Sequence, residues 1–160
     1  MQLERTHKKL GLRGLEAVEI VENLNTSLSS YQIFYHKMQN FHWNVEGPDF
    51  FDIHDITEKL YKESMKNIDT IAERVRLLGG VPNYRLSDYI NNSKIVEDTH
   101  DLSGDNIKVI LLEDVETLLK VLSETADYSI NHNDYGTVHV MQEMIHGLEM
   151  MHYKLQSWLK

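Results

Sequence analysis

Apolar residues recur at helical spacing along four long stretches of the chain. The first two stretches run from about Leu15 to Asn44 and from about Asp49 to Leu78. The other two run from a cap at Ser103 or Asp105 to about Asn131, and from about Tyr135 to Leu159. In each stretch, apolar side chains follow the i, i+3, i+4, i+7 pattern of a helix that buries one face. The sequence therefore predicts an all-α protein with four long helices.

The connections between these helices differ in length. Gly47-Pro48 interrupts the chain between the first two helices, and Gly79-Gly80 ends the second. The connection from Val81 to Leu102 is too long for a tight turn, and Ser87 could cap a short helix within it. Four helices with one long middle connection predict an up-down-down-up bundle.

Length and composition narrow the class of protein. At 160 residues the chain is most simply one domain, and the absence of cysteine excludes disulfides and thiolate metal sites. It has no apolar run long enough to span a membrane and no apolar export signal, so the cytoplasm is the default location. A net charge of −9 disfavours a dominant electrostatic grip on nucleic acid and favours attraction of cations. No phosphate-binding loop or nucleophile elbow is present.

Five potential metal ligands stand at regular intervals in the first half of the chain. They are His42, His54, Glu58, Asp69 and Glu73. We expect His42 to lie at the end of the first helix and the other four residues to lie on the second helix. Residues four apart lie on one helix face, and eleven residues make close to three turns. The four ligands on the second helix therefore project from one side of it.

The distances along this helix exclude a single metal ion that is bound by both ligand pairs, His54/Glu58 and Asp69/Glu73, of one chain. At about 1.5 Å per residue, Glu58 and Asp69 are roughly 16 Å apart, and His54 and Glu73 roughly 28 Å. Metal–ligand bonds are only about 2.0–2.2 Å long. Two antiparallel copies of the helix, related by a two-fold axis, could bring the two ends together. Mixed imidazole and carboxylate ligation suits iron, manganese or zinc, while a solvated acidic face is the simpler alternative on spacing alone.

The complete string of residues resembles the Dps family of mini-ferritins. His42-Trp43-Asn44, Gly47-Pro48, His54, Glu58, Asp69 and Glu73 stand in the register of that family's ferroxidase motif. The one departure is Glu58, where the family usually has Asp. The resemblance spans about Leu12 to Leu159. It implies a ferritin-like four-helix bundle over residues 15–160, a short extra helix in the crossover, and an N-terminal tail over residues 1–14.

The resemblance also implies a function. Members of the family form cytoplasmic dodecamers that oxidise Fe²⁺, preferentially with hydrogen peroxide, store the Fe³⁺ and limit oxidative damage during stress. On this basis His42 and His54 are nitrogen donors, and Glu58, Asp69 and Glu73 are carboxylate ligands of a di-iron site between subunits. Trp43 is a candidate electron donor, for which a packing role is equally consistent. Asp127 and Asp134 are candidate pore residues.

Two alternatives stay open on the sequence. The tail contains Lys8, Lys9 and Arg13, so DNA binding and compaction in stationary phase is a second candidate function, although Glu4 and the acidic remainder oppose it. An inert helical interaction protein is a third.

Glu143 and His146 form an isolated Glu-x-x-His pair, for which we expect a surface or structural role.

Overall fold

The computed structural model describes residues 11, 14–97 and 102–160. It contains α2 (Gly14–Asn44), α3 (Phe50–Leu77), α4 (Leu86–Asn92), α5 (Gly104–Asn131) and α6 (Tyr135–Trp158), and no strand within the described ranges. The four predicted long helices are confirmed, with bounds close to those expected. The predicted tail over residues 1–14, including Lys8, Lys9 and Arg13, lies almost wholly outside the described residues.

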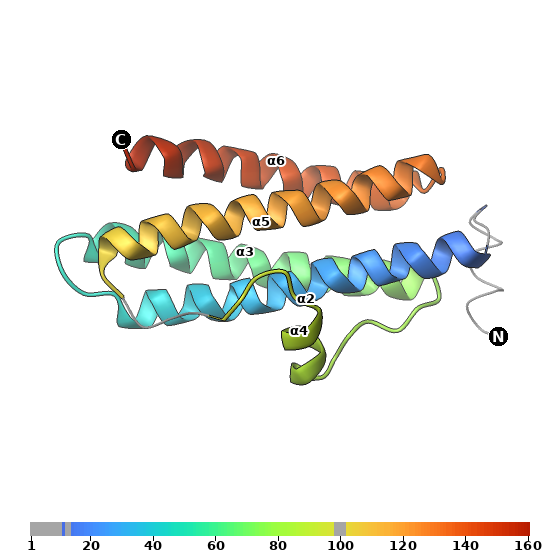
Figure 1. The fold of residues 1–160 in the computed structure, drawn as a ribbon, viewed down its shortest axis with the longest axis horizontal. Coiled ribbons are helices and arrows are strands. Elements are labelled where there is room, and N and C mark those ends of the chain that lie inside the picture. The colour runs from blue at the N-terminus through green and yellow to red at the C-terminus, as the bar shows by residue number, and fades with distance from the viewer. Residues whose placement is uncertain (1–10, 12–13, 98–101) are drawn as a thin grey trace.

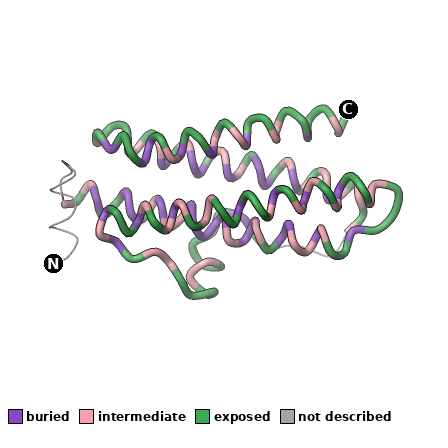
Figure 2. The backbone as a smooth tube through the Cα atoms, turned by 180° about the vertical axis from the view of Figure 1, so that it is seen from behind, coloured by how far each residue is buried: buried purple, intermediate pink, exposed green. Residues whose placement is uncertain are grey.

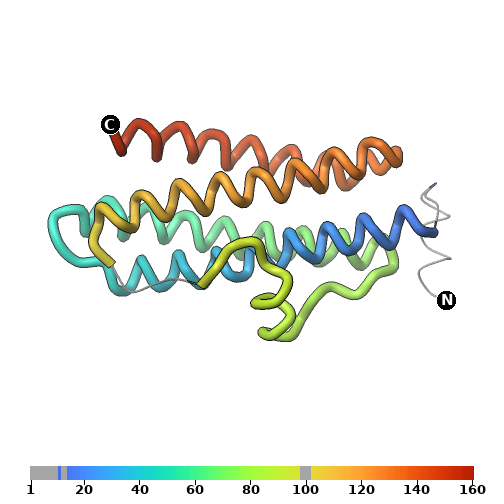
Figure 3. The backbone as a smooth tube through the Cα atoms, viewed as in Figure 1, coloured from blue at the N-terminus to red at the C-terminus, as the bar shows by residue number. Residues whose placement is uncertain are grey.

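The long helices form two antiparallel pairs. α2 packs along α3, and α5 packs along α6. The crossover returns the chain along the length of the bundle, so that α5 starts at the same end as α3 and runs parallel to it (Figures 1 and 3). This is the up-down-down-up arrangement of a ferritin-like bundle. The part of the chain that the structure describes contains no helix that is both long and apolar enough to cross a membrane.

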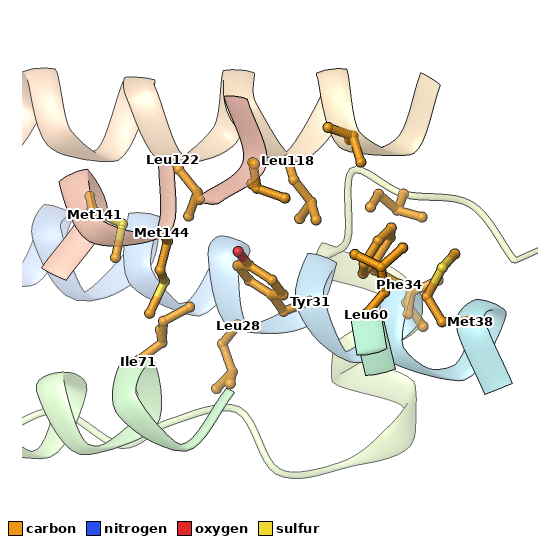
Figure 4. Close-up of a cluster of buried hydrophobic side chains, with 14 of the residues drawn as sticks. Leu28, Tyr31, Phe34, Met38, Leu60, Ile71, Leu118, Leu122, Met141 and Met144 are labelled. Atoms are coloured by element: carbon orange, nitrogen blue, oxygen red, sulfur yellow. The ribbon is translucent and has the colours of Figure 1, made fainter. Parts of the chain in front are cut away.

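The core lies where the inner faces of the helices meet. Tyr31 and Phe34 of α2 face Leu118 and Leu122 of α5, with Met144 of α6 beside them (Figure 4). All five side chains are buried, and full burial of a large apolar side chain contributes about 1.5–3 kcal/mol. Figure 2 shows the buried positions as stripes along each helix, with exposed residues on the opposite face. Apolar burial at helical spacing thus explains why the sequence pattern located the helices correctly.

An ion pair between α2 and α5 is buried inside this bundle. The Nζ of Lys37 on α2 lies 2.6 Å from the Oδ2 of Asp114 on α5, and the two side chains are only 8% and 10% exposed. A buried charge is tolerated when its partner is equally buried and close. The pair therefore links α2 to α5 inside the core.

The short helix α4 lies outside the bundle against α2 (Figure 1). Its start corrects the predicted cap. The amides of Asp88 and Tyr89 donate to the carbonyl of Arg85, so the helix begins at Leu86 and Ser87 lies within its first turn. Arg85 occupies the cap position and makes no side-chain capping bond.

Polar side chains of α2 hold the crossover in place. Asn83 donates from its backbone amide to Asn25 and from its side chain to Ser29, at 2.8 and 3.1 Å. Beyond α4, the amide of Lys94 donates to Ser30 at 3.0 Å. These contacts on both sides of α4 position it more than its own cap does.

Candidate metal centre

The turn between α2 and α3 brings two predicted ligands together. His42 lies in the last turn of α2 and His54 near the start of α3. Gly47 in the turn has a φ of 98°, a left-handed conformation that glycine adopts without strain. The chain reverses within residues 45–49, and the two imidazole rings stack with centroids 3.7 Å apart and planes 22° from parallel.

Each histidine is held by a hydrogen bond to the backbone of the other. The Nδ1 of His42 lies 2.9 Å from the carbonyl oxygen of His54, and the Nδ1 of His54 lies 2.8 Å from the carbonyl oxygen of His42. A carbonyl oxygen can only accept, so each Nδ1 carries the proton and each Nε2 has the free lone pair in the neutral ring. This is the usual way in which a protein fixes the tautomer of a metal-binding histidine.

Aromatic rings pack on both sides of the histidine pair. Phe50 stacks on His54 with centroids 5.0 Å apart, and the ring of Tyr61 contacts His42 edge to face at 5.3 Å. Both aromatic side chains are partly buried against the core. They restrict rotation of the imidazoles, so the two nitrogen donors have fixed orientations before any metal binds.

Glu58 lies one helical turn after His54 and carries a counter-ion of its own. Its Oε1 is 2.5 Å from the Nζ of Lys62, in an exposed i, i+4 ion pair. The hydrogen bond and the charge of Lys62 lower the pKa of Glu58, and the nearby imidazoles of His42 and His54 lower it further. The carboxylate is therefore charged and close to the histidines, but a metal ion must displace Lys62 to take its full charge.

Asp69 and Glu73 stand on the same helix and are exposed. α3 is continuous over Phe50–Leu77, so the rise of an α-helix places Asp69 roughly 16 Å beyond Glu58. Within the described residues, no group of three or more histidine, cysteine or acidic side chains is close enough to hold a metal ion. The structure thus brings His42 and His54 together, places Glu58 nearby, and keeps Asp69 and Glu73 apart from them.

Comparison with known proteins identifies the family. The model of the ferritin-like domain matches residues 21–160. A DNA protection during starvation protein from Brevibacillus brevis is 33% identical over 137 residues, which cover 86% of this chain and 92% of that protein. A second such protein, from Bacillus anthracis, is 30% identical over 141 residues, or 88% of this chain and 97% of the relative. This chain belongs to the Dps family of ferritin-like proteins.

Solved Dps structures agree with this assignment. A Dps protein from Bacillus brevis superposes with a TM-score of 0.90 at 30% identity, over 93% of this chain and 100% of that one. A Dps protein from Vibrio cholerae O1 superposes with a TM-score of 0.89 at 29% identity, over 93% and 94% of the two chains. The latter is described as a member of a broad superfamily of ferritin-like diiron-carboxylate proteins. Membership of the Dps family supports a role in iron storage and protection.

The two candidate pore residues of this Dps chain have different surroundings. Asp127 is exposed near the end of α5. Asp134 caps α6 and accepts hydrogen bonds from the amide and the hydroxyl of Thr137. Its Oδ1 also lies 2.5 Å from the Nη2 of Arg74 on α3. Because its side chain is only 3% exposed, Asp134 joins α3 to α6 rather than presenting a carboxylate to solvent.

The other residues of interest lie on the surface of this Dps chain. Trp43 is 66% exposed. Glu143 and His146 are exposed on α6, and the Oε1 of Glu143 lies 3.6 Å from the Nε2 of His139. The expected surface position of the Glu-x-x-His pair is therefore observed.

Sequence reasoning missed Lys62 and Tyr61 as parts of the centre. The spacing in the sequence indicates both residues, because Lys62 is four residues after Glu58 and Tyr61 is seven residues after His54. Positions with these spacings lie on the same face of a helix. Listing every side chain on the ligand face, polar or aromatic, would have included both.

Proposed function

We propose that this Dps chain is a ferroxidase that oxidises Fe²⁺ with hydrogen peroxide at sites shared between two copies of the chain, and that it stores the product. The observation that carries the proposal is the locked histidine pair. Its two Nε2 atoms have free lone pairs, and the carboxylate of Glu58 lies nearby on the same helix face. Neutral imidazole with carboxylate is a donor set that suits iron.

Each group of ligands has its own part in this reaction. His42 and His54 hold Fe²⁺ without adding charge. Glu58 would leave Lys62 to bind the metal, and Asp69 and Glu73 of a two-fold-related copy would complete the site. Three carboxylates then offset the additional charge as each Fe²⁺ becomes Fe³⁺. Two Fe²⁺ give one electron each to one hydrogen peroxide, which takes up two protons and leaves as two waters.

The proposed assembly is supported by membership of the Dps family and by ligands that lie too far apart on one chain to meet. A closed shell of twelve copies, in the cytoplasm, would contain these sites between its subunits, with Asp127 as a candidate pore residue. Sedimentation of the purified protein at micromolar concentration should then show one large species. DNA binding through the tail stays a prediction, because Lys8, Lys9 and Arg13 lie outside the described residues.

Complementation between damaged chains tests the shared site. One variant carries His42→Ala and His54→Ala, and the other carries Asp69→Ala and Glu73→Ala. Shells of either variant alone should bind Fe²⁺ weakly and oxidise it slowly. A mixed two-fold dimer has one site with all of its ligands intact, so co-assembled shells should recover up to about half of the wild-type rate.

The readout is Fe²⁺ oxidation in refolded mixtures, with mixing confirmed by native mass spectrometry. A site within one chain predicts no recovery, because every chain keeps its own lesion. Confirmed mixing without recovery would therefore refute the shared site. If the wild-type protein itself fails to consume Fe²⁺ with peroxide, ferroxidase activity is refuted as well.

A further inference from the structure

The turn that pairs the two histidines is attached to the start of α5 and to the end of α6, which lie at the same end of the bundle (Figure 1). The link is Lys108 on α5, whose side chain is only 11% exposed. Its Nζ lies 3.2 Å from the Oδ2 of Asp49 and 2.8 Å from the Oδ1 of Asp105. The same Nζ lies 5.3 Å from the centre of the Trp158 ring, a favourable position for a cation. One ammonium group thus joins all three segments.

The backbone brings the turn close to α5 at the same place. Glu46 forms an isolated parallel bridge with Ser103, the residue that caps α5. At the next residue, Gly104, a Cβ would come within 2.7 Å of the Oδ2 and 2.9 Å of the Cβ of Asp49. Real Cβ atoms do not approach other atoms so closely, so glycine is what allows the start of α5 to pack against Asp49. Backbone pairing, close packing and charge therefore all attach the turn to α5.

Asp49 adjoins the residues that hold the ring of His54. It lies directly before α3 and makes no side-chain capping bond to that helix, and its carboxylate pairs with Lys108 instead. The next residue, Phe50, stacks on the ring of His54. A shift of Asp49 would therefore move both this ring and the His54 carbonyl that accepts the hydrogen bond of His42.

We propose that Lys108 is a positioning residue for the iron site. Through Asp49, it holds the start of α3 where the imidazoles of His42 and His54 present their Nε2 atoms to Fe²⁺. This inference rests on the proposed ferroxidase function. α3 is paired with α2, and α5 with α6, so Lys108 links the two pairs at the end where the histidines lie.

A purely structural role for Lys108 makes a different prediction. Loss of the link would then lower the stability of the metal-free protein and leave the metal affinity of the folded protein unchanged. A positioning role changes both the affinity and the coordination geometry. Measurements on folded, assembled protein separate the two roles.

The test compares Lys108→Met with wild type in the absence of oxygen. Calorimetry with Fe²⁺ should show an affinity about tenfold lower, at the low end of the effect of residues that orient a metal ligand. The d–d absorption of Co²⁺, added as a probe, should change because it reports ligand geometry. Lys108→Arg should restore both readings, since a guanidinium group also pairs with carboxylates and stacks on aromatic rings.

A double-mutant cycle tests whether Lys108 acts through Asp49. Asp49→Ala should lower the Fe²⁺ affinity as much as Lys108→Met, and it carries the test if Lys108→Met does not fold. The double variant should lose no more than either single variant, because both residues act through one contact. Losses that add would show that the two residues act independently and would overturn the proposal.

Two control variants separate this effect from changes in charge and stability. Lys154→Met removes an exposed lysine near Trp158 and should match wild type. Tyr128→Phe removes the hydrogen bond from α5 to Glu19 of α2 at the other end of the bundle. It should lower the melting temperature of metal-free protein slightly and leave the Fe²⁺ affinity unchanged.

Other outcomes refute the inference in distinguishable ways. If folded Lys108→Met binds Fe²⁺ as tightly as wild type and gives the same Co²⁺ spectrum, Lys108 is only structural. If Lys154→Met weakens Fe²⁺ binding equally, loss of positive charge is the cause. If wild type itself does not bind and oxidise Fe²⁺, the proposed function fails and this inference fails with it.

Discussion

The candidate ligands near the two ends of α3 are held to different degrees. At the first end, His42 and His54 are fixed by two hydrogen bonds and by stacked rings. At the other end, Asp69 and Glu73 are exposed. The anchored residue there is Arg74, next to Glu73, which reaches Asp134 and Thr137 of the second helical pair. The first end fixes its ligands directly, whereas the second fixes only the backbone that bears them.

This difference fits a site assembled from two chains. Under the proposed function, the histidine end would present oriented donors before assembly, because two hydrogen bonds already fix its rings. Under the proposed function, the acidic end would gain its ligand geometry only when a partner subunit brings a metal to it. We expect changes at the two ends to separate stability from metal binding, and the following tests use that separation.

The largest effect should come from the anchor beside Glu73. Asp134→Ala removes the cap of α6 and leaves the guanidinium of Arg74, which is 14% exposed, without its partner. Breaking one side of a buried ion pair costs about 3–5 kcal/mol. Asp127→Ala, at an exposed position, should change stability by about 0.5 kcal/mol or less. Urea unfolding at one protein concentration measures both, and similar costs would show that Asp134 is not an anchor.

The next effect compares the ligand pairs themselves in metal-free protein. His42→Ala with His54→Ala removes two side-chain hydrogen bonds to carbonyls and the ring stack. At about 1 kcal/mol for each hydrogen bond, the expected loss is about 2–3 kcal/mol. Asp69→Ala with Glu73→Ala should cost about 0.5 kcal/mol or less. Unfolding in the presence of a chelator tests this, and equal losses would remove the distinction between a fixed and an open end.

A smaller effect concerns the counter-ion of Glu58. Lys62→Ala removes the ammonium group that pairs with the carboxylate of Glu58, so a metal no longer has to displace it. Since exposed ion pairs are weak, Fe²⁺ affinity should rise only about two- to fivefold. Anaerobic calorimetry measures the change, with Lys66→Ala, an exposed lysine on the same helix, as the control. An unchanged or lower affinity in Lys62→Ala would mean that Lys62 does not compete with the metal.

The smallest effect is a pH dependence of the same pair. Lys62 holds the pKa of Glu58 below its ordinary value, so folding favours the charged form. The resulting stability is present above the ordinary carboxyl pKa and is lost as pH falls through the lowered one. The stability difference between wild type and Lys62→Ala should therefore shrink in acid. A difference that stays constant over this range in a pH series of unfolding curves would contradict the assigned cause.

The sequence predicted the long helices well because their formation depends on a local pattern. Apolar spacing, together with the breaks at Gly47-Pro48 and Gly79-Gly80, located α3 to within one residue at each end. The start of α4 was placed wrongly because contacts with α2, through Asn83 and Lys94, position that segment. Such contacts join residues far apart in sequence and leave no local pattern.

The sequence supplied the candidate ligands but not the surroundings of their side chains. Spacing identified His42 and His54, but their bonds to each other's carbonyls depend on the path of the turn. The family resemblance made Asp134 a candidate pore residue, and that role stays a prediction. Its partner Arg74 is sixty residues away in the sequence, so its burial could not be read from neighbouring residues.

The two reciprocal hydrogen bonds of His42 and His54 also set the register of α2 against α3. Each bond joins a side chain of one helix to the backbone of the other, so both form at only one axial offset of α2 against α3. A slip of one turn, about 5.4 Å, would break both bonds at once. An insertion in the turn over residues 45–49 would therefore misalign the helices themselves, whereas the long crossover can change length at a cost that grows only slowly. His42 and His54, which would hold the metal, therefore also require this turn to keep its length.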